Sequence, residues 1–271
     1  MAESKPRGRF VWFDLVTSDP RATLEFYPAV TGWSTTQWDG GTPYTMWTAN
    51  GASLGGVMQL PPRPANAPAP SAVKGPALSA AEGPHWLAYI SSPDLDETVR
   101  LADSLGARVI MPPSNVPSVG RFAVLTDPQG ARFAVFTPES EAPGQEGDAQ
   151  LGEFSWHELA THDYPAAFRF YERLFGWEKS TAMDMGGGAI YQMFNRNGLM
   201  LGGMFNRTPD LSGLPSWLHY IRVEDLDRAL AAVTDRGGTI VSGPMEVPGG
   251  SKVAQCLDPQ GASFALHQRR E

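Results

Sequence analysis

Apolar and polar positions along the chain follow two alternating periods, and the changes between them divide the sequence into four similar quarters. Each quarter opens with a short apolar run of strand type, which leads into a longer stretch with apolar residues at helical spacing. The strand-type runs cover 10–16, 86–91, 154–160 and 217–223, and the helical stretches cover 19–32, 94–106, 163–176 and 225–237. Further strand-like runs follow each helical stretch, so each quarter is predicted to form a strand, a helix and three strands.

The residues at the ends of these elements support the assignment. Every helical stretch begins at an Asp, whose carboxylate accepts an unpaired backbone N–H, and ends at a Gly, which suits the left-handed position that closes a helix. Asn50-Gly51 and Asn197-Gly198 are typical of two-residue hairpin turns, because both central residues of such a turn need positive φ. The tetrapeptide Asp-Pro-Gln-Gly at 127–130 and 258–261 predicts a tight turn.

The quarters are paired by an internal duplication. A Trp on the first strand, a Phe-Tyr pair late in the helix and a Gly-Trp pair after it occur in both halves, and Trp12 and Trp33 recur as Trp156 and Trp177 at one spacing. The duplication predicts a first domain at 8–138, a linker at 139–150 and a second domain at 151–268. Residues 61–83 are rich in Pro and Ala and have no counterpart in the second half, which favours a mobile connection over a lid on a binding site.

Composition narrows the class of protein. The 271 residues are 42% hydrophobic, enough to build a core in each of two domains. No apolar run reaches the roughly 18 residues that a membrane span needs, and the N-terminus lacks the apolar region of a signal peptide, so a cytoplasmic protein is expected. The single Cys256 lies in an apolar run and is predicted to be buried and inert. A net charge of −8 without a basic cluster argues against nucleic acid and membrane surfaces and leaves a small molecule as the expected partner.

The order of elements and the repeated motifs resemble the vicinal oxygen chelate superfamily, the group of glyoxalase I, bleomycin-resistance proteins, fosfomycin-resistance enzymes and extradiol dioxygenases. The resemblance runs from about Phe10 to His267 and is carried by the Asp-capped helix that leads to Phe-Tyr and Gly-Trp, and by the Asp-Pro-x-Gly turn before each last strand. It implies an α+β fold of tandem glyoxalase-like domains, each made of two βαβββ modules that form a curved mixed sheet around a cleft.

The resemblance also implies where a metal ion would bind. Metal-using members of the superfamily take a His from the first strand, a His from the fifth and a Glu from the eighth. In this sequence the matching positions hold side chains that cannot bind a divalent ion, namely Trp12, Leu87 and Ala134 in the first half and Trp156, Leu218 and Ala265 in the second. The sequence therefore predicts no metal cofactor, with a divalent Fe, Mn, Ni or Zn ion as the alternative.

Three histidines keep that alternative open. His157, His219 and His267 lie on the corresponding strands of the second half, close to the implied ligand positions. Side chains alternate between the two faces of a strand, so His157 and His219, each one residue away, are expected to point away from the cleft. His267 is two residues beyond Ala265 and keeps the face of that residue. A site made by all three would need a bulge in at least one strand.

Asp14 and Glu158 occupy equivalent places, two residues beyond Trp12 and Trp156, and are the candidate catalytic groups. The sequence slightly favours the interpretation that each simply accepts backbone N–H groups near the helix start. Otherwise, a buried carboxyl group beside an indole would have a raised pKa and could act as a general acid or base or hold a cationic or hydroxylated ligand. The aromatic and thioether residues expected at the same depth suit a planar ligand or a plain core and are Tyr44, Met46, Met58, Tyr89, Tyr191, Met193, Met204 and Tyr220. The predicted ligand-binding residues are Trp12, Asp14, Tyr89, Trp156, Glu158, Tyr220 and Arg222.

Three functions remain open from the sequence. The first is a metal-independent protein that holds an aromatic or amphipathic compound in a Trp-lined cleft, as bleomycin-resistance proteins do. The second is a metal-dependent lyase, isomerase or extradiol-type dioxygenase of the same superfamily, and the third is a scaffold for protein interaction. Because a fused pair of domains can complete its clefts internally, we expect a monomer or a weak homodimer.

Overall fold

The computed structural model describes residues 7–40, 43–60, 83–139, 147–208 and 214–270, and it confirms a strand, a helix and three strands in each quarter. The helices are α1 (Pro20–Thr31), α2 (Leu95–Ser104), α3 (Tyr164–Phe175) and α4 (Leu226–Asp235). The strands of the first half are β1 (Phe10–Thr17), β2 (Ser34–Trp38), β3 (Tyr44–Ala49), β4 (Ala52–Gln59), β5 (His85–Ser91), β6 (Arg108–Val116), β7 (Gly120–Thr126) and β8 (Arg132–Pro138). Those of the second half are β9 (Phe154–Thr161), β10 (Glu178–Asp184), β11 (Ile190–Arg196), β12 (Leu199–Asn206), β13 (Ser216–Arg222), β14 (Thr239–Glu246), β15 (Lys252–Leu257) and β16 (Ser263–Gln268).

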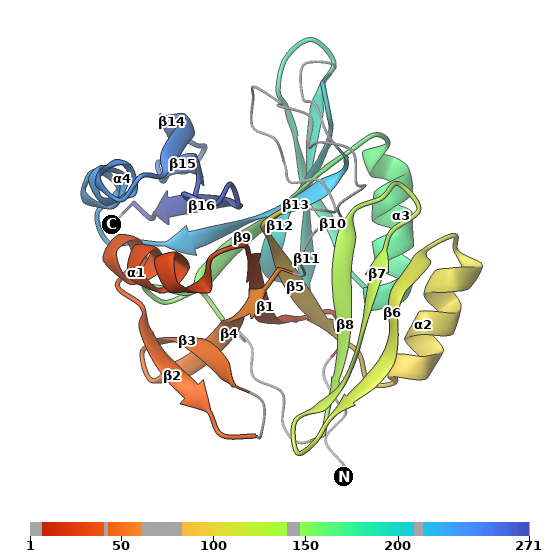
Figure 1. The fold of residues 1–271 in the computed structure, drawn as a ribbon. Coiled ribbons are helices and arrows are strands. Elements are labelled where there is room, and N and C mark those ends of the chain that lie inside the picture. Colours follow the sequence, from red (N-terminus) through yellow and green to blue (C-terminus); the bar gives the residue numbers. More distant parts are fainter. Residues whose placement is uncertain (1–6, 41–42, 61–82, 140–146, 209–213, 271) are drawn as a thin grey trace, which may run out of the picture.

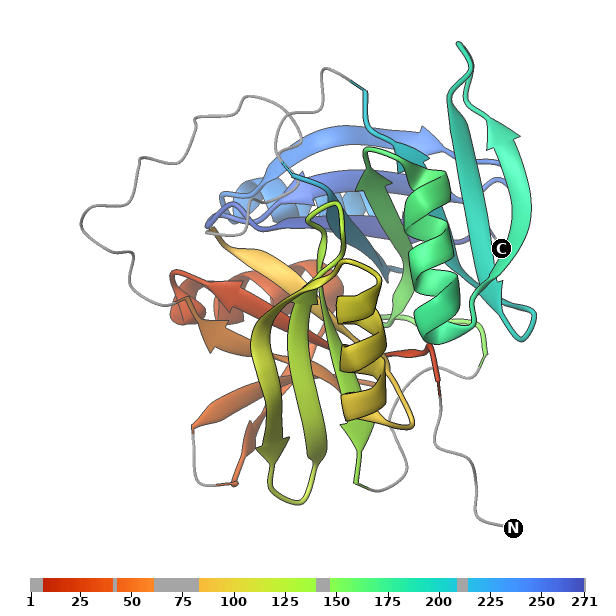
Figure 2. The same ribbon diagram turned by 90° about the vertical axis from the view of Figure 1, so that its right-hand side faces the viewer.

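Each half forms one eight-stranded mixed sheet. The strand orders are β2-β3-β4-β1-β5-β8-β7-β6 and β10-β11-β12-β9-β13-β16-β15-β14. The first strands of the two modules, β1 with β5 and β9 with β13, pair antiparallel at the centre, and each also pairs in parallel with the last strand of its own module. Both sheets curve strongly (Figures 1 and 2). This is the tandem arrangement of βαβββ modules that the sequence predicts.

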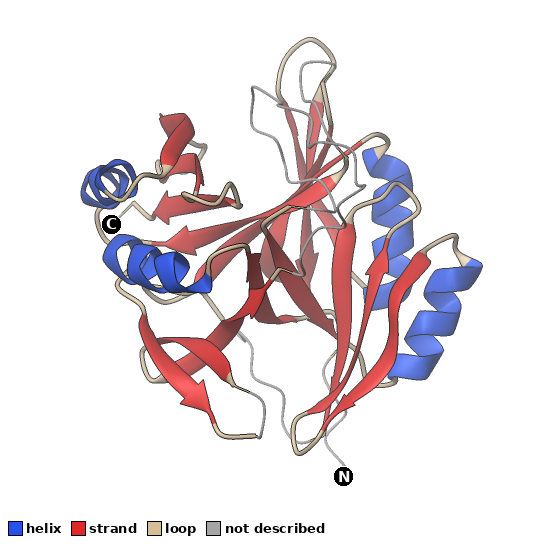
Figure 3. Cartoon of the chain, viewed as in Figure 1, coloured by secondary structure: helices blue, strands red, loops and turns tan. Residues whose placement is uncertain are grey.

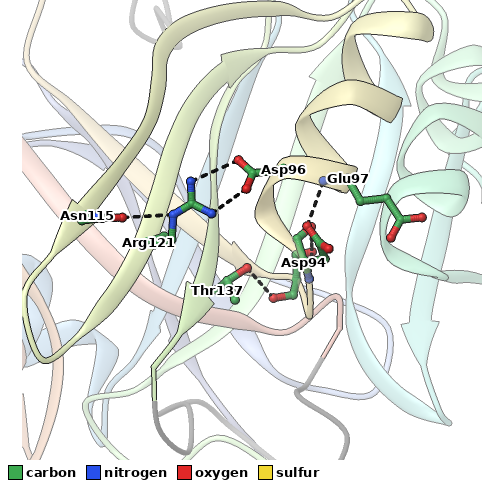
Figure 4. Close-up of polar contacts among 7 residues, drawn as sticks. Asp94, Asp96, Glu97, Asn115, Arg121 and Thr137 are labelled. Carbon is green, nitrogen blue, oxygen red and sulfur yellow. Dashed lines mark hydrogen bonds and ion pairs between the residues drawn. The ribbon is translucent and has the colours of Figure 1, made fainter.

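The helix ends follow the sequence signals. The side chains of Asp19, Asp94, Asp163 and Asp225 cap the four helices, and Gly32 and Gly176 close α1 and α3 in the left-handed conformation. At α2 the Asp94 carboxylate accepts the N–H of Glu97, and nearby Arg121 on β7 donates to both oxygens of Asp96 at 2.6 and 3.1 Å (Figure 4). This exposed ion pair contributes little to stability by itself.

The predicted turns are also confirmed. Asn50 and Gly51 have φ of 51° and 78°, and Asn197 and Gly198 have φ of 51° and 80°, so both pairs close hairpins as positive-φ turns. In each Asp-Pro-Gln-Gly turn the glycine N–H donates to the aspartate carbonyl, at 3.0 Å for Gly130 and 2.9 Å for Gly261. These turns place an aspartate side chain at the start of the last strand of each domain.

The two domains pack through their helix-bearing sides. Helix α1 lies against α4, and α2 lies against α3, as Figures 1 and 3 show on opposite sides of the molecule. One hydrophobic core runs continuously through both domains. The ring of Phe13 stacks on that of Phe154 with 3.8 Å between the ring centroids. The ring centroids of Phe10 and His157 are 3.7 Å apart. The domains therefore share their core instead of having two separate ones.

The repeated Gly-Trp motif belongs to this interface. The indole N–H of Trp33 in the first domain donates to the carbonyl of Gly152 in the second at 2.6 Å, and the indole N–H of Trp177 donates back to the carbonyl of Gly8 at 2.8 Å. Residues 147–150, predicted as the end of the linker, contact the second domain, since Asp148 pairs with Arg269. Most of the Pro- and Ala-rich segment 61–83 lies outside the described residues, as do 140–146.

None of the described helices is long and apolar enough to cross a membrane. Cys256 is buried, and burial raises the pKa of its thiol to about 12, as expected of an unreactive thiol.

Candidate functional site

The side chains of the central strands separate cleanly onto the two faces of each sheet. On β1, Phe13 and Leu15 point into the core shared with the helices, whereas Trp12 packs on the opposite face with Leu87 and Tyr89. The second sheet has the same division, with Trp156 and Tyr220 on the face turned away from the helices. We call this side the open face of each sheet. Asp14 and Glu158 lie there beside the tryptophans, as the sequence predicts.

Asp14 is the centre of a hydrogen-bonded group in the first domain. Its Oδ1 accepts the hydroxyl of Tyr44 in a short hydrogen bond and the indole N–H of Trp12 at 3.1 Å, and its Oδ2 accepts the hydroxyl of Tyr89 at 2.7 Å. The Trp12 N–H also donates to the Tyr44 oxygen at 2.9 Å. We name these four residues, Trp12, Asp14, Tyr44 and Tyr89, the Asp14 cluster.

The second domain builds the corresponding group around Glu158. Oε2 of Glu158 accepts the hydroxyls of Tyr191 at 3.0 Å and Tyr220 at 3.3 Å, and Oε1 receives the Gln255 amide at 3.4 Å. The indole N–H of Trp156 donates to Tyr191 at 2.7 Å. These five residues form the Glu158 cluster.

Both carboxyl groups have a raised pKa because burial disfavours their charged form. For Glu158 the pKa rises from 4.5 to about 7, and the hydrogen bonds from Tyr191 and Tyr220 limit the rise. The pKa of Asp14 is raised for the same reason, against hydrogen bonds from Tyr44, Tyr89, Trp12 and the backbone of Gly56. A carboxyl group that titrates near neutral pH can both donate and accept a hydrogen bond to a ligand.

Paired glycines set the position of one tyrosine in each cluster. A Cβ atom on Gly203 would lie 2.0 Å from the ring of Tyr191, and one on Gly56 would lie 2.1 Å from the ring of Tyr44. The rings therefore lie directly on the backbone of the neighbouring strand, where a larger residue would displace them. This close approach accounts for the second glycine of the Leu-Gly-Gly sequence in both halves.

Two sequence-based expectations about this face are wrong. The alternative that the carboxylates chiefly accept backbone N–H groups at the helix start does not hold, because side-chain hydroxyls are their main partners. Met58 is 40% exposed and fits neither a cavity wall nor a core, whereas Met204 is fully buried in the core shared by the domains, in agreement with the plain-core alternative. The hydroxyl roles of Tyr44 and Tyr191 and the part played by Gln255 were missed, because pairing across a sheet depends on register. The sequence signal for the two tyrosines was the Tyr-x-Met pattern, which occurs at 44–46 and again at 191–193.

The three histidines lie on opposite faces of the second sheet, as strand alternation predicts. His157 and His219 are buried in the core between the domains, with their Nδ1 atoms 3.0 Å apart. His267 lies on the other face and contacts the Ser155 hydroxyl through Nδ1 at 2.9 Å. The pKa of His219 falls to about 3 because of burial, and that of His157 is lowered by burial and by His219. The histidines therefore do not converge on one metal ion.

Arg222 and His267 occupy one end of the open face. Arg222 pairs in register with His267 on β16, which puts both on the side of Tyr220. The guanidinium of Arg222 donates to the backbone carbonyl of Ala149, and its charge helps to lower the pKa of His267 after the larger effect of burial. The structure thus places Arg222 against the chain that enters the second domain, and its hydrogen bonds among the described residues do not include one to Glu158.

The residues present do not fit the metal site that the superfamily implies. The matching positions on the open faces hold Leu218 and Ala265 within the apolar cluster around Tyr220, and Leu87 and Ala134 within that around Tyr89. Among the described residues, no three His, Cys, Asp or Glu side chains lie close enough together to hold a metal ion. A small recess of about 30 Å³, lined by Trp86 and Trp217 and by Arg132 among others, lies at the junction of the domains and contains no residue of either cluster.

Two curved sheets built from paired βαβββ modules, with a carboxyl group on each open face, define a tandem protein of the glyoxalase type. The family profile described as Glyoxalase/Bleomycin resistance protein/Dioxygenase superfamily matches residues 9–135 and 153–266, and the chain belongs to this superfamily. It is 28% identical to the anthracycline biosynthesis protein DauV of Streptomyces sp. (strain C5), over 97% of this chain and 94% of that protein. It is also 38% identical to the putative glyoxylase CFP32 of Mycobacterium bovis, over 48% of this chain and 44% of the relative.

Solved structures share the fold at low sequence identity. The Mn(II)-bound glyoxalase from Novosphingobium aromaticivorans superposes with a TM-score of 0.62 at 15% identity, over 99% of this chain and 83% of that one. The 2,2',3-trihydroxybiphenyl 1,2-dioxygenase from Sphingomonas wittichii gives a TM-score of 0.62 at 12% identity, over 98% and 91% of the two chains. At such identities the likeness extends to the fold alone.

Proposed function

We propose that this chain binds an aromatic or amphipathic small molecule on the open face of one or both sheets, without a resident metal ion. The observation that carries the proposal is that apolar and aromatic residues stand on these faces where other members of the superfamily have metal ligands. The positions that the superfamily uses for metal ligands hold Trp156, Leu218 and Ala265 in the second domain, and a carboxyl group with tyrosine donors, Glu158, lies beside them. A face of this kind offers flat apolar surface together with a few polar groups that orient a ligand.

The relatives support an aromatic ligand in particular. DauV and the equally similar DnrV of Streptomyces peucetius are both described as anthracycline biosynthesis proteins, and DnrV is 28% identical over 97% of this chain. Anthracyclines contain fused aromatic rings with hydroxyl and carbonyl groups, which suit an indole face next to carboxyl and phenol groups. We therefore extend the proposed ligand to a polycyclic aromatic compound with oxygen substituents.

Elemental analysis of the purified protein for Fe, Mn, Ni and Zn, followed by calorimetric titration with anthraquinone, tests the proposal. Binding by protein that contains no metal, and that is unaffected by a chelator, is the expected result. Near-stoichiometric metal that is required for binding would contradict a metal-independent protein and would lead to assays for glyoxalase and dioxygenase chemistry. Failure of metal-free protein to bind either anthraquinone or its hydroxylated derivatives would contradict ligand binding on the open faces.

The two halves of the chain also support a monomer. Each cluster is built entirely from one domain, and the helix-bearing sides that would otherwise be exposed cover one another within the chain. A second copy is therefore not needed to complete either cluster or the core.

A further inference from the structure

The two clusters come from one duplicated sequence, but they use their carboxylate oxygens differently. In the first domain each oxygen of Asp14 already accepts a tyrosine hydroxyl, and Oδ1 accepts the Trp12 indole as well. In the second domain both tyrosine hydroxyls donate to Oε2 of Glu158. Within the described part of the chain, Oε1 receives only the Gln255 amide, at 3.4 Å, which is long for a hydrogen bond. One oxygen of Glu158 therefore retains capacity for a ligand.

Accessibility differs in the same direction. Trp12 and Tyr44 of the first cluster are partly exposed, as are Trp156 and Tyr191 of the second, so the two faces differ at the carboxyl residue itself. Asp14 is only 3% exposed, whereas Glu158 is partly exposed. The extra methylene of glutamate carries its carboxyl group further from the strand than that of aspartate. A ligand can therefore approach Glu158 more closely than Asp14.

The strand that borders the clusters also differs. Three residues before the Asp-Pro-Gln-Gly turn, the second domain has Gln255 where the first has Val124. Val124 is buried among apolar side chains, whereas the amide of Gln255 donates to Glu158 and to the Tyr220 hydroxyl at 3.3 Å. The second open face thus has one more polar group that can orient a ligand.

We propose that the Glu158 cluster is the ligand site of this chain, that it recognises a planar aromatic compound through an acidic hydroxyl (a phenol or an enol), and that the Asp14 cluster is a structural counterpart. This inference rests on the proposed function. The ligand hydroxyl donates to Oε1 of ionised Glu158, and the ring system packs on the exposed part of Trp156. A charge-assisted hydrogen bond of this kind is stronger than one between neutral groups.

Proton binding follows from this geometry. Burial raises the pKa of Glu158 to about 7, so the free protein holds both the protonated and the ionised form near neutral pH, and the ligand selects the ionised form. The titratable groups in contact with Glu158 are the phenols of Tyr191 and Tyr220, whose pKa values are raised well above 10 by burial and which stay protonated. Arg222 and His267 lie on the same face, at its far end. Affinity for a ligand whose own hydroxyl stays protonated over this range should therefore rise about tenfold between pH 6 and pH 8.

The test compares 2-naphthol, whose hydroxyl stays protonated at these pH values, with naphthalene, which lacks the hydroxyl, by isothermal titration calorimetry at pH 6, 7 and 8 in two buffers that differ in ionisation enthalpy. Wild-type protein should bind 2-naphthol about tenfold more tightly than naphthalene at pH 8, with a smaller difference at pH 6, and should release protons on binding 2-naphthol at pH 7. Glu158→Gln should remove both the preference and the proton release while still binding naphthalene, which shows that the variant is folded. Asp14→Asn is the matched substitution in the first domain and should keep the preference.

Each other outcome has a distinct meaning. Equal binding of the two probes at every pH would overturn the inference and leave the proposed function standing. Loss of the preference in Asp14→Asn but not in Glu158→Gln would place the ligand in the first domain and would also overturn the inference. Binding of neither probe by wild-type protein would remove the proposed function itself. The pH profile of wild-type protein needs no variant, so the test does not depend on the folding of Glu158→Gln.

Discussion

Tyr171 of the second domain donates its hydroxyl to Oδ2 of Asp127 in the first domain at 3.1 Å, and the duplicated pair makes the reciprocal bond, from Tyr27 to Asp258 at 3.3 Å. Each tyrosine oxygen also accepts an indole N–H from its own domain, Trp217 for Tyr171 and Trp86 for Tyr27. All these groups are buried. The tyrosine of each Phe-Tyr pair and the aspartate of each Asp-Pro-Gln-Gly turn therefore hold the domains together, and neither contributes to an open face.

Removal of one of these hydroxyls should weaken the whole molecule. Tyr171→Phe leaves a carboxylate oxygen of Asp127 and the Trp217 indole without their buried partner, which should lower the free energy of unfolding by about 1–3 kcal/mol. Urea denaturation measures the loss. Tyr164→Phe is the control, because among the described residues the Tyr164 hydroxyl has no hydrogen-bond partner. Equal stability of Tyr171→Phe and wild type would show that the hydroxyl does not hold the interface.

The buried histidine pair should make stability depend on pH. The folded-state pKa of His219 is about 3 and that of an unfolded histidine is 6.5, so the unfolded chain binds more protons between these values and stability falls as pH drops below about 6.5. One such histidine should lower the free energy of unfolding by about 2 kcal/mol between pH 6.5 and pH 5. Denaturation curves at several pH values should therefore be less steeply pH-dependent in His219→Phe than in wild type.

Buried carboxyl groups change the stability with pH in the direction opposite to that of the histidines. The pH profile of wild-type protein alone therefore does not isolate His219, and the comparison with His219→Phe is needed. The raised pKa values of Asp127, Asp258 and Glu158 give stability that is present at low pH and is lost as pH rises through the folded-state values. These groups remain in His219→Phe, so their effect cancels in the comparison. Identical pH profiles for the two proteins would mean that His219 charges in the folded state.

The phenols should control the ionisation of Glu158. Tyr191→Phe removes a hydrogen bond that favours the carboxylate, so the pKa of Glu158 should rise further above its value of about 7. Carbon-13 NMR of labelled glutamate side chains follows this titration, and Glu158→Gln identifies the resonance. Tyr44→Phe, the equivalent change in the first domain, should leave the resonance unmoved. A downward shift in Tyr191→Phe would contradict the hydrogen bond.

Gly203 should be required for the position of Tyr191. An added methyl group would meet the tyrosine ring at 2.0 Å, so Gly203→Ala should push the ring away from Glu158 and destabilise the protein by about 1–3 kcal/mol. The pKa of Glu158 should then move in the same direction as in Tyr191→Phe. Gly198→Ala is a control for added volume, because nothing lies within 4 Å of its Cβ, although its φ of 80° adds backbone strain. An unchanged titration of Glu158 in Gly203→Ala would show that the ring is not held there by the glycine.

Separate expression of the halves should reveal the shared core. Residues 8–138 alone would expose Phe10, Phe13 and Trp33, which are buried against the second domain. We expect this half to aggregate or to remain unfolded by itself and to copurify with residues 147–268 when both are expressed together. Sedimentation of the full chain should give a monomer, since the same surfaces are covered within it. A stable, folded first half with no affinity for the second would contradict a shared core.

The local elements follow directly from the sequence, because they depend on short-range chemistry. Aspartate caps, glycines with positive φ and alternating apolar residues act within a few positions of the chain, so four helices and the central strands are predicted almost to the residue. The duplication then fixes the number of domains. Alternation along β9, β13 and β16 also places His157 and His219 on one face and His267 on the other.

The partners of these residues depend on tertiary structure. Asp14 meets Tyr44 and Tyr89 only because three strands from two modules come together in one register, and no local pattern specifies that register. The repeated Phe-Tyr, Gly-Trp and Asp-Pro-Gln-Gly motifs were expected to define the family, and the packing of the domains gives them a second role at the interface. The difference between Asp14 and Glu158 likewise arises from burial and hydrogen-bond geometry, which depend on residues far apart in the chain. The sequence by itself determined the elements, the duplication and the faces of the carboxyl, tryptophan and histidine side chains on the central strands, whereas only the folded structure decided which of those side chains meet.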